Sequence, residues 1–166
     1  MASVAQLTSM SQAHSHTVSF SSRKKLLGLD VGTKVIGAAL TDTDQRVAFP
    51  YTVVKWLGNE DVLLSWIRTL LQEESVEKVI MGLPHEKGQY SGMSNERVRA
   101  LAHHLAARIT ADTGLLVDFV DEHVSTLEAR NRLDDLGSDV DSLGHGRTDD
   151  VAAQILLERY LHQQSV

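Results

Sequence analysis

The sequence predicts an α/β domain whose mixed five-stranded sheet combines an antiparallel three-stranded meander with two parallel strands, flanked by helices. Apolar runs of strand length come first, and later strands alternate with segments of helical periodicity. The first three runs are joined by short connections, which suit antiparallel hairpins. Each later strand follows a helix-long segment, which is the connection that parallel strands need.

Length and composition narrow the class of protein. The chain has 166 residues, no cysteine and a net charge of -6. It suits one domain, and we place that domain at residues 23–166. Without cysteine, any metal must be held by oxygen or imidazole, and disulfides are excluded. The charge disfavours nucleic-acid binding through bulk charge, although an acidic metal site with local basic patches would give the same total.

Residues 1–22 form a leader with nine serines or threonines and no acidic residue. This composition is similar to that of an organelle transit peptide, but the arginines typical of such peptides are absent. We therefore keep two interpretations, a disordered leader of a cytoplasmic protein and a transit peptide to a plastid or mitochondrion. No apolar stretch approaches the ~18 residues that span a bilayer, so we expect a soluble protein with no membrane partner.

The first strand is the most informative segment. An apolar run bounded by Lys25 and Gly32 ends on Asp30, which predicts a buried strand that delivers one carboxylate to a polar site. The chain returns through residues 35–40, which predicts a hairpin. A third strand follows at residues 46–54, where Pro50 indicates an edge strand or a bulge.

The middle of the chain predicts two amphipathic helices around a buried strand at residues 77–84. Asn59 is expected to cap the first helix. Its apolar stripe consists of Leu63, Trp66, Ile67, Leu70 and Leu71. The second helix, residues 94–109, is expected to bury Val98, Leu101, Ala102, Leu105 and Ile109 and to carry Arg97, His104 and Arg108 on one cationic stripe. That stripe is either a solvated face or a contact for a phosphate backbone.

The last third of the chain carries more acids. A strand at residues 115–120 ends in Asp121 and Glu122, and a capping box is expected at residues 125–128. Residues 134–147 are rich in aspartate and predict a mobile loop. The final helix is expected over residues 148–160.

Three acids can converge on one edge of this sheet. Asp30 and an acid after the last strand, Asp121 or Glu122, reach the same edge if their strands are parallel. On the last helix, Asp149 shares the face of Ala152, Ala153, Leu156 and Tyr160, whereas Asp150 aligns with Gln154 and Glu158. We therefore predict that Asp149 faces inward and Asp150 faces water. Three carboxylates without cysteine suit Mg²⁺ or Mn²⁺, and two such ions about 4 Å apart would serve phosphodiester hydrolysis.

Four motifs together resemble the YqgF family of Holliday-junction resolvases or pre-16S rRNA nucleases. They are Gly28-Leu29-Asp30-Val31-Gly32-Thr33-Lys34, then Gly82-Leu83-Pro84, then Asp121-Glu122-His123 with Ser125-Thr126, and Asp149-Asp150-Val151-Ala152-Ala153. The resemblance implies a ribonuclease H-like fold and a metal-dependent nuclease. It selects Asp30, Glu122 and Asp149 as the catalytic, metal-binding acids, and its substrate would be structured RNA or branched DNA bound by a monomer or homodimer.

The chain departs from the family pattern at two positions. His123 and Val35 stand where the family has arginine, which removes permanent positive charge. Candidate substrate contacts are Thr33, Lys34, Arg97, His123 and Arg147.

Two alternatives to the nuclease stay open. A noncatalytic nucleic-acid or ribosome-assembly partner would keep the fold after its basic contacts decayed. A nucleotide-binding module is the other, because residues 30–33 also resemble the phosphate loop of the actin and sugar-kinase superfamily. The length of the chain counts against it, since those proteins use two such domains.

Overall fold

The computed structural model describes residues 24–84, 93–122, 131 and 146–164. In chain order the elements are β1 (Lys25–Val31), β2 (Val35–Thr41), β3 (Ala48–Lys55), α1 (Glu60–Glu73), β4 (Val76–Pro84), α2 (Met93–Thr113), β5 (Leu116–Glu122) and α5 (Gly146–Gln164). The capping box expected at residues 125–128 and most of the loop expected at 134–147 lie outside the described residues. No helix in the described ranges is long and apolar enough to cross a membrane.

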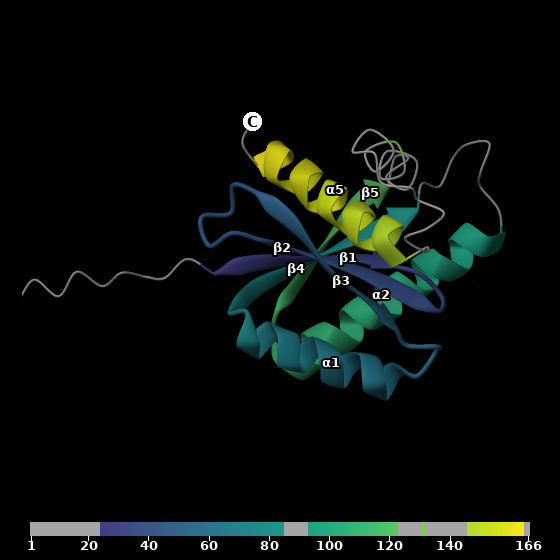
Figure 1. The fold of residues 1–166 in the computed structure, drawn as a ribbon. Helices are drawn as coiled ribbons and strands as arrows, with labels where there is room; N and C mark the ends of the chain where they lie inside the picture. Colours follow the sequence, from purple (N-terminus) through teal and green to yellow (C-terminus); the bar gives the residue numbers. More distant parts are fainter. Residues whose placement is uncertain (1–23, 85–92, 123–130, 132–145, 165–166) are drawn as a thin grey trace, which may run out of the picture.

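The strands form one sheet in the order β3-β2-β1-β4-β5. β1 pairs with β2, and β2 with β3, in antiparallel register. β4 pairs in parallel with both β1 and β5. The predicted mixed sheet, a meander followed by two parallel strands, is therefore confirmed (Figure 1).

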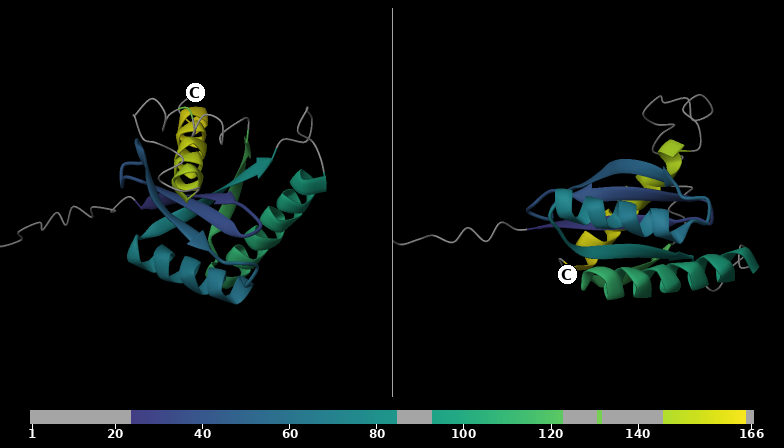
Figure 2. Two further views of the ribbon diagram at one scale, coloured as in Figure 1. Left: turned by 45° about the vertical axis from the view of Figure 1, so that its right-hand side comes forward. Right: turned by 90° about the horizontal axis from the view of Figure 1, so that it is seen from below.

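Helices cover both faces of the sheet. α1 and α2 lie on one face, and α5 lies on the other and crosses the strands diagonally (Figure 2). The larger core cluster, which includes Leu27, Leu29 and Met81, packs beneath α1 and α2. The smaller cluster, which includes Leu26, Ile80 and Val120, packs beneath α5. Alternate residues of each central strand thus face opposite layers, as the pleat requires.

β3 is an edge strand, and Pro50 accounts for its irregular pairing. The register shifts between Ala38, which pairs with Thr52, and Ala39, which pairs with Pro50. Tyr51 is the extra residue of this bulge. Both readings of Pro50, an edge strand and a bulge, are confirmed because proline has no N–H to donate to a ladder.

Two helices differ from their predicted bounds. α2 continues to Thr113, four residues beyond the predicted end, and stops where Gly114 takes a left-handed backbone with φ +72°. Its last turn is polar, so the apolar period on which the prediction rested ended too early. α5 begins at Gly146, so Arg147 lies in its first turn. The prediction that Arg147 belongs to the preceding loop is wrong. At α1 the prediction is confirmed, since the Asn59 side chain accepts a hydrogen bond from the Val62 N–H.

Candidate active site

Asp30 lies at the end of β1, at the edge of the sheet where β4 and β5 also end. It pairs across the hairpin with Gly37 and is half-buried. Residues opposite one another on neighbouring strands share a face, and so do residues two apart on one strand. Positions 28, 30 and 37 therefore all belong to the face that α5 covers, as the contacts of Gly28 and Gly37 with that helix show.

Glycine at positions 37 and 28 lets α5 lie directly on the sheet. A Cβ at Gly37 would stand 2.0 Å from the Asp149 carbonyl oxygen, and one at Gly28 would stand 2.6 Å from Leu157 Cγ and 3.0 Å from the Ala153 oxygen. The first turn of α5 thus rests on the residue that pairs with Asp30. This contact brings the backbone of Asp149 next to the strand position opposite Asp30, although the two aspartates are far apart in sequence.

The far end of α5 is tied to the sheet by a polar cluster. Lys78 Nζ of β4 donates to Asp118 Oδ2 of β5 at 2.8 Å and lies 3.1 Å from the Tyr160 hydroxyl of α5, which itself donates to Asp118 at 2.7 Å. The hydrogen bonds from Lys78 and Tyr160 hold the pKa of Asp118 below its usual value. The bond to Asp118 raises the pKa of Lys78, and burial raises that of Tyr160. This cluster connects the second half of α5 to β4 and β5.

The prediction that Asp150 faces water is wrong. Asp149 and Asp150 are both half-buried, and Oδ1 of Asp150 is shielded from solvent. The reason is that α5 also packs over the meander, where Gln154 on the same side as Asp150 donates to the Ala48 carbonyl of β3 at 3.0 Å. Burial therefore does not separate the two aspartates, and the choice of Asp149 still rests on helical register and on the D-x-x-A-A motif.

The last two residues of β5 occupy opposite faces of the sheet. Asp121 pairs with Leu83, and Glu122 pairs with Pro84, at the carboxyl end of both strands. Position 121 belongs to the face of Phe119, which packs on the α1 and α2 side. Position 122 belongs to the face of Val120, beneath α5, and so to the face of Asp30. Backbone register thus favours Glu122 over Asp121, a choice that the strand pattern alone left open.

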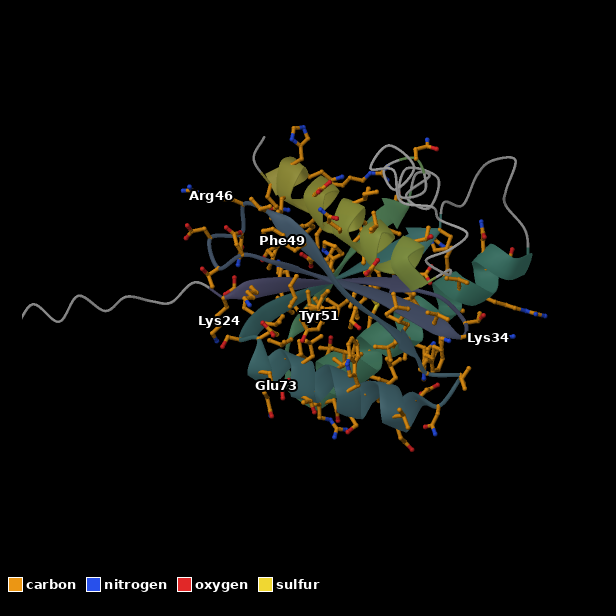
Figure 3. The ribbon with its side chains drawn as sticks, in the orientation of Figure 1. Lys24, Lys34, Arg46, Phe49, Tyr51 and Glu73 are labelled. Carbon is orange, nitrogen blue, oxygen red and sulfur yellow. The ribbon has the colours of Figure 1, made fainter. Side chains whose placement is uncertain are left out.

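The β1–β2 turn carries Thr33 and Lys34, and both are exposed. The turn is closed by a hydrogen bond from the Gly32 N–H to the Val35 carbonyl at 2.9 Å. Figure 3 shows Lys34 at one end of the sheet and Lys24 at the other, so Lys34 lies at the end where β1 delivers Asp30.

The cationic stripe of α2 is largely directed at α1. His104 Nε2 lies 3.0 Å from Glu60 Oε2, and Arg108 lies 3.4 Å from the same oxygen. Arg97 is exposed and lies seven residues before His104, nearer the start of α2. Neither interpretation of this stripe, a solvated face or a phosphate contact, included the interhelical contact that engages His104 and Arg108. Arg97 stays the candidate for a phosphate contact.

Arg99 is a residue that the sequence interpretation missed. Its guanidinium donates to the Pro84 carbonyl at 2.6 Å, at the carboxyl end of β4. No sequence signal distinguished it, because it lies on neither stripe of α2. It places a positive charge beside the residue that pairs with Glu122.

Arg147 belongs to the first turn of α5 by its backbone, and His123 lies outside the described residues. Among the side chains that the structure describes, no three of histidine, aspartate and glutamate gather closely enough to hold a metal ion. Two of the three predicted acids, Asp30 and Asp149, are described there. Both offer the oxygen ligands that Mg²⁺ and Mn²⁺ prefer, so the donor set is chemically compatible with either ion.

Comparisons with known proteins identify the family of this chain. A family model described as RuvX, Holliday junction resolvase, matches residues 24–163. A protein of Anaeromyxobacter sp. strain Fw109-5 named "Putative pre-16S rRNA nuclease" is 38% identical over 137 residues, which cover 82% of this chain and 96% of that protein. A protein of the same name from Moorella thermoacetica is 36% identical over 138 residues, covering 82% and 94% of the two chains.

Solved structures support the same fold. The Thermus thermophilus RuvC in complex with a Holliday junction substrate superposes with a TM-score of 0.54 at 14% identity, covering 86% of this chain and 96% of that one. The yeast mitochondrial Holliday junction resolvase Ydc2 gives a TM-score of 0.54 at 9% identity, covering 86% and 80%. At these identities the likeness concerns the fold.

Proposed function

The chain belongs to the RuvX family of Holliday junction resolvases, and from that premise we propose that it is a metal-dependent endonuclease that hydrolyses phosphodiester bonds in structured nucleic acid. The substrate would be precursor 16S rRNA, as the names of its relatives suggest, or a four-way DNA junction. The observation that carries the proposal is the seating of the first turn of α5 on Gly37, the cross-strand partner of Asp30.

Three acids would form the reactive centre. Asp30 comes from β1, Glu122 from the end of β5 and Asp149 from the start of α5, and together they would hold Mg²⁺ or Mn²⁺. When bound, such ions supply Lewis-acid stabilisation of the charge that develops on the phosphate and lower the pKa of water. Carboxylates supplied by the sheet and by a helix packed closely on it would be positioned before substrate arrives, which would reduce the reorganisation that the reaction requires.

Basic side chains around this edge would orient the substrate. Lys34 and Thr33 extend from the β1–β2 turn, and Arg97 and Arg147 belong to the starts of α2 and α5. His123 follows Glu122 directly and, where the family has arginine, could donate one hydrogen bond when neutral and more when protonated. Contacts to phosphate would position the strand without reading its sequence.

The test is Mg²⁺- or Mn²⁺-dependent cleavage of labelled four-way junctions and precursor 16S rRNA. We expect Asp30→Asn to abolish cleavage, and Asp44→Asn to retain it, because Asp44 lies exposed in the β2–β3 connection at the opposite edge. Thermal melting with and without Mn²⁺ gives a second readout, since Asp30→Asn should also reduce the metal-induced rise in melting temperature.

Two results would redirect the assignment. Tight binding of either substrate by folded wild-type protein, with no cleavage in either metal, would favour the noncatalytic partner. The loss of two arginines of the family pattern, at Val35 and His123, supports that alternative. Protection by ATP in thermal melting, without nuclease activity, would favour the nucleotide-binding module.

A further inference from the structure

The corner between β3 and α1 is locked onto the turn that follows Asp30. Trp56 is buried, and its indole N–H donates to the Gly32 carbonyl at 3.1 Å. The backbone N–H groups of Trp56 and Leu57 both donate to the Lys34 carbonyl, at 3.1 and 3.3 Å. These three hydrogen bonds join the corner and the β1–β2 turn into one bonded unit at the carboxyl end of β1.

Leu57 is held outward by this unit. Its backbone is left-handed, with φ +53°, which costs a residue with a Cβ roughly 1 kcal/mol. Its side chain is 76% exposed, the highest value for a large apolar residue in the described part of the chain. Leu57 thus keeps a strained backbone although its side chain contributes nothing to the core. Strain retained in a well-bonded segment is a reason to look for function there.

The charges around Leu57 favour an anionic partner. Lys34 is exposed in the β1–β2 turn, and Lys55 is exposed at the end of β3, where it pairs with Val35. Glu60, three residues after Leu57, is engaged by His104 and Arg108 of α2. Asp61 is exposed in the same turn of α1 and opposes this trend, so a polyanion would approach from the side of the two lysines.

We propose that Leu57 is a substrate-contact residue that packs against an unstacked nucleobase while Lys34 and Lys55 bind the phosphates on either side of it. Apolar side chains that face nucleic acid can insert between bases, and lysines neutralise the backbone. The common chemistry of the two candidate substrates is a base freed from its stack, at a junction crossover or in an unpaired flank. The inference rests on the proposed function, because it assigns a role in the same substrate complex.

The experiment measures binding without cleavage, in EDTA, so that it is independent of catalysis. The probes are a labelled RNA stem with an unpaired flank and a labelled four-way DNA junction. Leu57→Gly removes the side chain and suits φ +53°, so its stability should equal or exceed that of the wild type. We expect about tenfold weaker binding, the affinity equivalent of burying part of a leucine. Leu57→Met, which keeps a large apolar side chain, should bind nearly as tightly as the wild type.

Matched controls come from the other end of the strands, away from Leu57 and Lys34. Leu116 is 65% exposed at the start of β5, and Leu116→Ser should bind as the wild type does. Lys34→Ala should lower the slope of log affinity against log salt by about one, whereas Lys24→Ala should leave it unchanged.

The outcomes separate the two proposals. Weaker binding by Leu57→Gly supports the inference, and the probe that is affected, RNA or DNA, identifies the substrate. Wild-type affinity of Leu57→Gly for both probes, or no binding of either probe by the wild type, overturns it. Binding that depends on Leu57 without any metal-dependent cleavage overturns the nuclease assignment and leaves the contact in place.

Discussion

Replacing Gly37 by alanine should move the first turn of α5 away from Asp30. The new Cβ would stand 2.0 Å from the Asp149 carbonyl oxygen, 2.3 Å from its carbonyl carbon and 2.9 Å from the Asp150 nitrogen. All three atoms are backbone, so no side chain can rotate out of the way. Ordinary contact begins near 3.4 Å, so the helix must shift by more than about 1 Å. Overpacking of this kind costs about 1–3 kcal/mol of folding free energy.

The variant should lose cleavage activity even under conditions where it is fully folded. A displacement of about 1 Å at a reacting centre can lower a rate on the order of 100-fold. We would measure the free energy of unfolding in urea and the single-turnover cleavage rate under conditions where the variant is fully folded. The half-saturating Mn²⁺ concentration should rise as well, because two of its proposed ligands move apart.

Gly28→Ala is the matched control on the same helix. Its nearest contacts are Leu157 Cγ at 2.6 Å and the Ala153 oxygen at 3.0 Å, which lie about two turns and one turn of α5 beyond Asp149. We expect a comparable loss of stability and a much smaller loss of cleavage. Equal losses of cleavage in the two variants at equal stability would refute the geometric argument. Wild-type stability and cleavage in Gly37→Ala would show that α5 does not rest on β2 as described.

Three further predictions concern the supports of this edge. Trp56→Phe keeps the buried ring but removes the indole donor to the β1–β2 turn, so we expect a loss of about 1 kcal/mol in urea unfolding and a higher KM for cleavage with kcat nearly unchanged. Tyr160→Phe should lower the free energy of unfolding by about 1 kcal/mol at pH 7. Hydrogen bonds from Lys78 and then Tyr160 lower the pKa of Asp118 in the folded protein. The resulting stabilisation is complete above the unfolded pKa near 4 and is lost as pH falls through the lower folded pKa. The difference in unfolding free energy between Tyr160→Phe and wild type should therefore shrink as the pH of the unfolding series is lowered. Asn59→Ala should cost about 1 kcal/mol by removing the cap of α1, with no change in cleavage at temperatures where the protein is folded.

Each of these predictions has a contrary result. An unchanged KM in Trp56→Phe would mean that the turn keeps its shape without the indole bond. A difference between Tyr160→Phe and wild type that grows as pH falls would reverse the assigned sign of the Asp118 contribution. Reduced cleavage by fully folded Asn59→Ala would show that the start of α1 takes part in the site.

Local patterns were sufficient for the elements themselves. The apolar period of α1 and its cap at Asn59 follow from neighbours in the chain, and so does the irregularity at Pro50. The ends of α2 and α5 were predicted less well, because polar residues at a helix end have no apolar period to mark them. The directions of the strands followed from connection lengths, since short links allow hairpins and helix-long links allow parallel pairs. The position of β4 beside β1 came only from the folded sheet.

Contacts between distant segments were beyond the reach of such patterns. The engagement of His104 and Arg108 by Glu60 depends on how α1 and α2 lie side by side on the sheet. The partial burial of Asp150 depends on the packing of α5 over β3, and the outward position of Leu57 depends on bonds to a turn more than twenty residues earlier. None of these partners is near the other in sequence, so periodicity carries no information about them.

The sequence by itself determined the class of fold, the strand that ends on Asp30, and the family motifs that single out three acids, because each of these is written in residues close together along the chain. The tertiary structure decided which of the acidic positions share a face of the sheet. Sheet register placed position 122 and not position 121 on the face of Asp30, and the lack of a side chain at Gly37 let the start of α5 rest on the strand beside it. Both depend on how closely, and in which register, backbone segments that are far apart in sequence lie in the folded sheet.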